Sequence, residues 1–455
     1  MIKAEPVVKN GSSAPTVSDI IDQQPMSGFQ IWTMVLCGLV LVMDGFSTQT
    51  IGALALPVSV STHIPVSTFG PIFSASLFGL MIAALATGPI ADRWGRKWPI
   101  IFSTFMVAIF SILTARATSF NELFIFRFLT GLGIGGAMPN VVALASEYAP
   151  RRLLSVAVAM LFCGVPLGSL LCGVISSAML STWGWQWVFY IGGILPIALS
   201  LLLIFALAES VQFMVVRGRD PRKIAKLLAR ISPKNAATPT DFSAAAPHKG
   251  HEGAPVKQLF TEGRSVGTIL LWIPNFMNLL LMYFLINWLP ALLKESGMSV
   301  SAGVLAISFY NFGGILGSFV EGWLLNGFGA YLILLAEFGL CALFIGSLSA
   351  VSGSLPLVIV IAFTLGFLVT GAQAGLNVSS ARFYPTSIRS TGVGWSLGIG
   401  RIGSIVGPLV AGLLLSAGWK PFQVLLSGVT AALCAWLAIL VSNRTRGYAT
   451  PYGKQ

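Results

Sequence analysis

The stretch Gly88-Pro89-Ile90-Ala91-Asp92-Arg93-Trp94-Gly95-Arg96-Lys97 separates two long apolar runs of the sequence. Three of its residues are basic, and basic residues between membrane spans favour the cytoplasmic side. Asp92 can pair with an arginine or accept hydrogen bonds from a helix N-terminus. Gly88 and Gly95 allow sharp turns and close backbone approach. The stretch therefore predicts a short, charged cytoplasmic turn between two membrane-spanning helices.

The composition of the whole chain supports this reading. Of its 455 residues, 55% are apolar and only 9% are charged, against about 25% charged in soluble domains. This composition indicates a multi-pass membrane protein. The net charge is +12, and the basic residues fall in predicted inner loops and tails, except for five: Arg116, Arg127, Lys294, Arg401 and Lys420. The basic charge therefore reports membrane topology and does not indicate nucleic-acid binding.

About twelve apolar runs are long enough to cross a bilayer, which takes roughly 20 helical residues. They are continuously apolar and do not alternate, so helices are the expected spanning structure. The predicted spans are 29–57, 68–91, 98–117, 121–143, 153–180, 185–208, 266–290, 301–326, 330–350, 355–378, 388–417 and 419–442. The expected fold is an all-α membrane protein with two pseudo-symmetric six-helix bundles.

The basic loops alternate as they should for a chain with both termini in the cytoplasm. We expect a cytoplasmic tail, an N-terminal six-helix bundle, a cytoplasmic linker, a C-terminal six-helix bundle and a second tail, at 1–28, 29–208, 209–265, 266–442 and 443–455. The expected location is the cell inner (plasma) membrane, with a monomer as the functional unit. The five cysteines have the spacing of neither a metal site nor a disulfide framework, so we expect no metal and no cofactor.

The linker contains a basic amphipathic segment from Arg222 to Ile231, with its apolar residues on one face. Such a segment either lies on the inner membrane surface or forms a solvated linker helix, and we favour the second. An internal repeat is also visible, because Gly88-x-x-x-Asp92 recurs in the second half of the chain as Gly317-x-x-x-Glu321.

The Gly88–Lys97 stretch is similar to the loop between the second and third helices of the major facilitator superfamily. The run from Arg127 to Gly136 resembles the fourth-span motif of the same superfamily. This resemblance extends over essentially the whole chain and implies secondary transport by alternating access. It also implies gating roles for six residues, which are Asp92, Arg93, Arg96, Glu147, Glu321 and Arg389.

Ionisable residues in the middle of a span are costly and are functional candidates by default. The sequence has four of them: Asp44, Arg127, Glu337 and Arg401. Burial favours the neutral form of a carboxyl group, and no histidine lies in a span, so Asp44 is the expected proton carrier. The alternative is that Asp44 is permanently paired with an arginine.

The run Asp44-Gly45-Phe46-Ser47 resembles the Asp-Gly-x-Asp motif of aromatic-acid:proton symporters, with Ser47 in place of the second aspartate. The eleventh-span run around Arg401 and the run Asn287-Trp288-Leu289-Pro290 resemble the same branch. Arg401, or else Arg127, is expected to bind a substrate carboxylate. The other expected substrate-binding residues are Gln49, Asn287, Trp288, Tyr310, Asn311 and Gln373.

These features predict a transporter that imports a small aromatic carboxylate with protons. Two alternatives are a proton-driven exporter of drugs or aromatic compounds, and a membrane sensor that binds an aromatic acid without moving it. We expect no enzyme, because no catalytic constellation is present in the sequence.

Overall fold

The structure is a computed structural model, and we describe residues 21–22, 24–180, 182–218, 221–231, 256–351, 354–385 and 388–445. These described residues contain twelve helical segments that are long and apolar enough to cross a membrane, which confirms the predicted all-α membrane fold. Eleven of the segments are single helices: α2 (Gly28–Thr62), α3 (Phe69–Trp94), α4 (Lys97–Thr114), α5 (Phe120–Tyr148), α8 (Trp185–Ala206), α11 (Ser265–Glu295), α12 (Val300–Phe328), α13 (Ala330–Ala350), α14 (Leu355–Phe383), α15 (Arg389–Ser416) and α16 (Pro421–Thr445). The fifth span consists of two helices, α6 (Leu154–Phe162) and α7 (Gly164–Met179).

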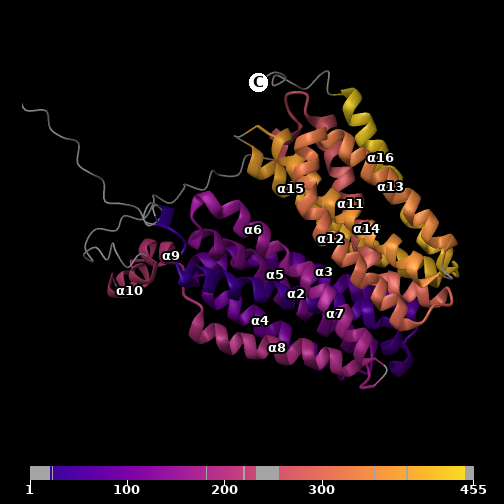
Figure 1. Ribbon diagram of the computed structural model, residues 1–455, viewed down its shortest axis with the longest axis horizontal. Coiled ribbons are helices and arrows are strands. Elements are labelled where there is room, and N and C mark those ends of the chain that lie inside the picture. Colours follow the sequence, from indigo (N-terminus) through magenta and orange to yellow (C-terminus); the bar gives the residue numbers. More distant parts are fainter. Residues whose placement is uncertain are drawn as a thin grey trace, which may run out of the picture.

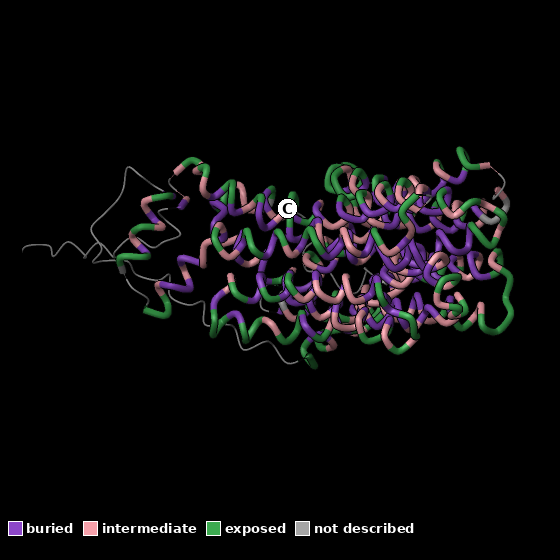
Figure 2. Tube along the Cα trace, turned by 90° about the horizontal axis from the view of Figure 1, so that it is seen from below, coloured by how far each residue is buried: buried purple, intermediate pink, exposed green. Residues whose placement is uncertain are grey.

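The helices form two packed groups, which we call the first half (α2 to α8) and the second half (α11 to α16) (Figure 1). Exposed residues line the long outer faces and both ends, whereas buried residues concentrate inside (Figure 2). Many exposed side chains on those faces are large and apolar, including Leu85, Phe205, Trp323 and Leu413. Apolar side chains on outward faces are what a lipid environment favours.

The two halves repeat each other in their closest helix contacts. In each contact, a glycine lies against the backbone carbonyl of a neighbouring helix, because only a residue without a Cβ fits there. The first half has Gly79, Gly131 and Gly168 against Phe128, Ser76 and Val42, and the second half has Gly313, Gly366 and Gly403 against Phe363, Tyr310 and Phe276. Each glycine of the first set has its counterpart 234 or 235 positions later in the sequence (for example, 313 − 79 = 234 and 366 − 131 = 235). We call this offset the register of the repeat.

This register corrects the alignment expected from the sequence, which placed Glu321 opposite Asp92. In the register that the glycine contacts define, Asp92 corresponds to Asn326, and Glu321 corresponds to Thr87. The two short motifs look alike, but their glycines differ in packing: Gly88 has open space around it, whereas Gly317 lies against the Phe367 carbonyl of α14.

The halves meet at one end of the molecule, which we call the closed end. There Gly52 of α2 lies against Ile286 and Asn287 of α11, Gly70 of α3 lies against Pro408 of α15, and Gly173 of α7 lies against Ser308 of α12. Towards the opposite end, which we call the open end, the two groups of helices diverge (Figure 1).

Two helices continue past the proline at which the predicted span ended. Helix α2 contains Pro57 and ends at Thr62, and α11 contains Pro290 and ends at Glu295. A proline inside a transmembrane helix removes one hydrogen bond, and neighbouring helices can compensate for it. In the fifth span the effect is stronger. Helix α6 ends at Phe162, whose carbonyl is four residues before Pro166 and is the one that a proline ring displaces.

The linker contributes two short helices, α9 (Val211–Val216) and α10 (Pro221–Ile231). The apolar face of α10 carries Ile224, Leu228 and Ile231, which are buried in one cluster with residues of α2, α5 and α9. Arg230 stacks over the ring of Phe29 at the start of α2. Helix α10 is thus a linker helix whose polar face is exposed, and its apolar face packs on the protein itself, so the alternative of a helix on the membrane surface has no support in these contacts.

Candidate functional site

Three helix ends of the first half meet in a charged cluster at the open end. Arg96, directly before α4, places its Nε 3.2 Å from Oε1 of Glu147 at the end of α5. Its Nη2 lies 3.5 Å from Oδ1 of Asp92 at the end of α3. The Asp92 side chain is 72% exposed, whereas that of Glu147 is 15% exposed, so the Arg96–Glu147 contact is the better shielded of the two. Arg93 of the same turn is exposed.

A fourth charged residue of this cluster, Glu209, was not among the sequence-based candidates. Its Oε1 accepts hydrogen bonds from the backbone N–H groups of Arg96 (2.8 Å) and Lys97 (3.3 Å), at the N-terminus of α4. These groups have no partner within the helix, and a negative charge is favourable there. Gly95 has a φ of +94°, and a Cβ there would overlap the Glu209 carboxylate. The only sequence signal was the run Ala208-Glu209-Ser210 after the sixth span.

Asp44 lies in the middle of α2 and is 3% exposed. Its Oδ2 has no hydrogen-bond partner among the described residues. The next residue, Gly45, packs against α7 and accepts a hydrogen bond from Ser169 at 3.1 Å through its carbonyl. Asp44 takes part in no salt bridge of the described chain. The alternative of a permanent pair with an arginine therefore has no support in the geometry.

Arg127 is enclosed within the first half and is 1% exposed. Its Nη2 donates to the hydroxyls of Thr114 (3.0 Å) and Thr130 (3.2 Å), and its Nη1 donates to the carbonyl of Ser47 at 3.5 Å. The guanidinium also lies 5.2 Å from the centre of the Phe189 ring. Arg127 therefore joins α2, α4, α5 and α8, and its terminal nitrogens are bonded to the protein.

The second half carries a network of amides between α11 and α14. Asn278 donates to Oε1 of Gln373 at 3.0 Å, and Gln373 in turn lies 3.4 Å from Oδ1 of Asn275 and 3.2 Å from Oδ1 of Asn377. In the register of the repeat, Asn278 occupies the place that Asp44 has in the first half. One half thus has a carboxyl group at this position, and the other half has an amide.

Arg401 lies on α15 and is half-buried. Its Nη1 is 3.5 Å from the hydroxyl of Tyr283 on α11, and it takes part in no salt bridge of the described chain. Compared with Arg127, it retains more donors for an external anion. A guanidinium with free donors can hold a carboxylate with two parallel hydrogen bonds.

Most of the remaining candidates form the contact between the halves near the closed end. Gln49 of α2 donates to the Ile286 carbonyl at 3.2 Å and accepts from the Asn311 amide at 3.2 Å. The Trp288 indole donates to the Pro408 carbonyl at 3.1 Å and meets the Phe73 ring edge-on. Asn287 donates to the Tyr283 carbonyl, and Tyr310 is buried where α12 meets α14.

Two gating candidates lie elsewhere. Glu321 is 1% exposed and lies inside the second half, close to Glu337. Its expected gating role rested on the alignment with Asp92, which the register of the repeat does not support. Arg389 is exposed at the start of α15, where its Nε donates to the Tyr384 carbonyl at 3.4 Å. The described residues contain no group of three metal-ligating side chains.

Comparison with known proteins identifies the family. The model of the Major Facilitator Superfamily matches residues 35–354 and 271–454, which together span most of the chain. The chain belongs to the Major Facilitator Superfamily. Two solved members of similar fold are a bacterial homologue of the lysosomal transporter Spinster in an inward-facing, occupied conformation (TM-score 0.72, 17% identity, covering 94% of this chain and 100% of that one) and a D-xylose-proton symporter (TM-score 0.69, 15% identity, 91% and 97%).

Several superfamily relatives are much closer in sequence. The 4-hydroxybenzoate transporter PcaK of Pseudomonas aeruginosa is 36% identical, over 95% of this chain and 98% of its own length. The gallate transporter of Pseudomonas putida is 38% identical, over 96% of both chains. The 3-(3-hydroxy-phenyl)propionate transporter of Escherichia coli is 34% identical, over 91% and 94%. All three are named as transporters, in agreement with the expectation of a transporter and not an enzyme.

Proposed function

We propose that this protein imports a hydroxylated aromatic carboxylate together with protons across the cell inner (plasma) membrane. The observation that carries the substrate class is the set of relatives, which are named for 4-hydroxybenzoate, gallate and 3-(3-hydroxy-phenyl)propionate. All three compounds combine a carboxylate, an aromatic ring and ring hydroxyls, so a single site needs one anion-binding group, an apolar slot and neutral polar groups.

Arg401 is the proposed anchor for the substrate carboxylate. It is half-buried and keeps unoccupied donors, whereas the terminal nitrogens of Arg127 are bound to Ser47, Thr114 and Thr130. The amides of Gln373 and Asn278 lie in the same half and are suited to bond a ring hydroxyl. Tyr283 beside Arg401 can stack on the ring or bond the carboxylate.

Asp44 is the proposed proton carrier. A buried carboxylate without a cationic partner is costly, so the protonated form is favoured when the site is cut off from water. Loss of the proton becomes favourable once the site opens to solvent. This difference couples the charge on Asp44 to the conformation of the protein.

The cycle follows from these roles together with the topology that the basic loops favour, which has the open end and both termini in the cytoplasm. The described conformation then faces inward. In the outward-facing conformation, Asp44 takes a proton from outside and the substrate binds Arg401. The halves then rock about the site. The proton and the substrate leave on the inside, after which the empty carrier returns, and the Asp92–Arg96–Glu147 cluster contributes to the inner gate.

The test is uptake of labelled 4-hydroxybenzoate by cells or proteoliposomes, with unlabelled gallate, benzoate and 3-(3-hydroxyphenyl)propionate as competitors. Wild type and Asp44→Asn are compared with and without a protonophore. We expect uptake that collapses with the protonophore and in Asp44→Asn, while Glu262→Gln, at an exposed carboxylate, serves as a control with normal uptake.

The other outcomes separate the rival functions. Uptake that persists in both treatments would make Asp44 structural and the protein a facilitator. Protonophore-sensitive extrusion of a preloaded compound would favour an exporter. Binding of labelled substrate to purified protein without accumulation in proteoliposomes would favour a sensor.

A further inference from the structure

Two buried carboxyl groups face each other inside the second half, apart from the residues used so far. Glu321 comes from α12 and Glu337 from α13, and they are 1% and 4% exposed. The two groups are close enough to share a hydrogen bond. Both lie against the glycine face of α14: a Cβ on Gly371 would be 3.0 Å from Oε1 of Glu337 and 3.6 Å from Oε2 of Glu321.

No cationic side chain of the described chain pairs with Glu321 or Glu337. All four carboxyl oxygens lack a conventional donor, and no salt bridge joins either residue to a cation among the described residues. Cys341, one turn beyond Glu337 on α13, is a free, buried cysteine. The helices that contact α12 or α13 carry few other titratable or charged side chains among the described residues. These are Cys37 and Asp44 (α2), Cys172 (α7), Tyr283, Lys294 and Glu295 (α11), Tyr310 (α12), Tyr331 (α13), Arg382 (α14) and Cys434 (α16). The two cations in this set, Lys294 and Arg382, are exposed near helix ends.

Two carboxylates in contact cannot both remain ionised away from water. One proton held between them removes the repulsion and satisfies two oxygens with a single strong hydrogen bond. The pair is therefore expected to hold at least one proton.

The fold itself does not require carboxyl groups here. In the register of the repeat, Glu321 and Glu337 correspond to Thr87 and Ser103 of the first half, and Gly371 corresponds to Gly136. The contacts agree, because a Cβ on Gly136 would meet the side chains of Ser103 and Thr87. The first half thus builds the same junction with two hydroxyls.

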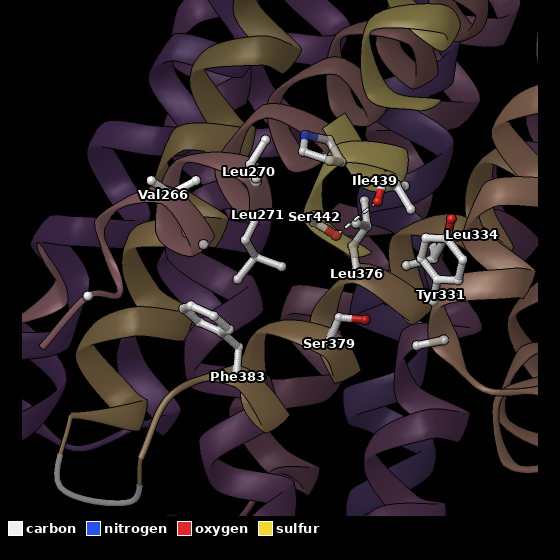
Figure 3. A pocket seen from close by; sticks show the side chains of 14 residues that line it. Val266, Leu270, Leu271, Tyr331, Leu334, Leu376, Ser379, Phe383, Ile439 and Ser442 are labelled. Carbon is white, nitrogen blue, oxygen red and sulfur yellow. Dashed lines mark hydrogen bonds between the residues drawn. The ribbon is translucent and has the colours of Figure 1, made fainter. Parts of the chain in front are cut away.

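A cavity of about 290 Å³ lies beside the pair, between α11, α13, α14 and α16. Figure 3 shows Leu376 and Ser379 of α14 near Leu334 and Tyr331 of α13 around this cavity. Leu334 separates the cavity from the pair, since it lines the cavity and also lies 3.0 Å from the Cβ position of Gly375, which touches Glu321. The cavity is on the open-end side, where α11 begins and α14 ends, and Leu334 borders both the cavity and the surroundings of Glu321.

We propose that Glu321 and Glu337 form a second proton-binding site, which holds one shared proton and exchanges it through this cavity during transport. Release requires that water from the cavity reach the pair: the proton then passes to that water, and both groups become hydrated carboxylates. The proposal rests on proton-coupled transport for its role in the cycle, but the protonation of the pair does not depend on that function.

The first measurement is infrared difference spectroscopy of purified protein during a pH titration, in the Asp44→Asn background. We expect a protonated-carboxyl band that titrates, and its loss in Glu321→Gln/Glu337→Gln. Glu321→Thr/Glu337→Ser, which copies the hydroxyl junction of the first half, should also lack the band. Either single glutamine variant should shift the position of the band, because an amide replaces the carboxylate that shares the proton. The same band in all variants would overturn the proposal.

The second measurement is the number of protons carried per substrate, obtained from the membrane potential that stops net flux in proteoliposomes. We expect the Glu321→Gln/Glu337→Gln variant to carry about one proton fewer than wild type, since one shared site is removed. Thr87→Val/Ser103→Ala is the matched control and should keep the wild-type ratio. An unchanged ratio in the glutamine variant would overturn the exchange during transport. If the wild type moves no aromatic acid, the proposed function fails while the infrared result still decides the protonation of the pair.

Discussion

Gln49 and Asn311 belong to different halves of the molecule, and the Asn311 amide donates a hydrogen bond to the Gln49 side chain at 3.2 Å. The same Gln49 donates to the Ile286 carbonyl. Both bonds exist only while the closed end is closed, so they stabilise this conformation over the opposite one.

Gln49→Ala should therefore shift the conformational equilibrium towards separation of the closed end. Loss of two neutral hydrogen bonds is worth about 1–2 kcal/mol, which is roughly a 5–30-fold change in the equilibrium constant. The measurement is the distance between spin labels at Thr118 and Lys294, with the five native cysteines replaced. Asn140→Ala is the control: it removes a buried hydrogen bond from the Asn140 side chain to the Gly136 carbonyl, within α5 alone, and should leave the distance distribution unchanged. An equal shift in both variants would contradict the role of Gln49.

Glu209→Ala should lower the thermal stability of the purified protein. It removes the acceptor for two backbone N–H groups at the start of α4, which is worth about 1–2 kcal/mol, as for other helix caps. Glu262→Ala removes a carboxylate that pairs with Arg264 at the surface, and its effect should be close to zero. Equal melting temperatures for Glu209→Ala and wild type would show that water replaces the cap.

Arg401→Lys should weaken substrate binding about 10–100-fold, because charge-assisted hydrogen bonds to a carboxylate contribute about 1.5–3 kcal/mol and lysine cannot form the bidentate pair. The measurement is inhibition of labelled uptake by unlabelled 4-hydroxybenzoate and by uncharged 4-hydroxybenzamide. Only the carboxylate should lose potency in the variant.

Arg127→Lys is the contrasting variant. In the wild type, the Arg127 guanidinium donates to Thr114, Thr130 and Ser47, and lysine cannot form all of these bonds. We therefore expect a lower melting temperature and an unchanged ratio of the inhibition constants of 4-hydroxybenzoate and 4-hydroxybenzamide. A loss of carboxylate selectivity in Arg127→Lys, but not in Arg401→Lys, would exchange the roles of the two arginines.

Gly366→Ala and Gly131→Ala should each destabilise the protein strongly, because the added methyl would overlap the carbonyl of Tyr310 or Ser76 on the neighbouring helix. Gly322→Ala places the same methyl in open space within α12 and should be neutral or stabilising by up to about 1 kcal/mol. Yield and melting temperature in detergent measure the difference. Comparable losses in all three variants would mean that tight packing does not explain the first two.

Hydropathy was sufficient to predict the twelve spans and their helical structure, because the bilayer requires long apolar segments with internally satisfied backbones. It was a poor guide to helix ends. Pro57 and Pro290 were expected to end their spans, yet each removes only one hydrogen bond, and both helices continue beyond them, to Thr62 and Glu295. The sequence could not show that these helices tolerate their prolines.

The candidate site was predicted in its parts but not in its pairings. The burial of Asp44 and Arg127 follows from their place in apolar spans, whereas the partners of Arg127 lie partly on other helices and depend on tertiary packing. Glu337 had no explanation until it was found beside Glu321. The sequence-based alignment of the repeat was wrong because a short Gly-x-x-x-acid motif can match by chance, whereas the glycine contacts between helices can be seen only in the structure.

The contacts between the two halves have a common chemistry: backbone carbonyls, glycines, neutral amides and aromatic rings, with no salt bridge across the boundary in the described chain. Such a contact depends on close packing and neutral hydrogen bonds, which salt does not screen. A change from dilute to concentrated salt should therefore leave the seal at the closed end as it was, whereas the Asp92–Arg96–Glu147 cluster at the open end should weaken as ionic strength rises.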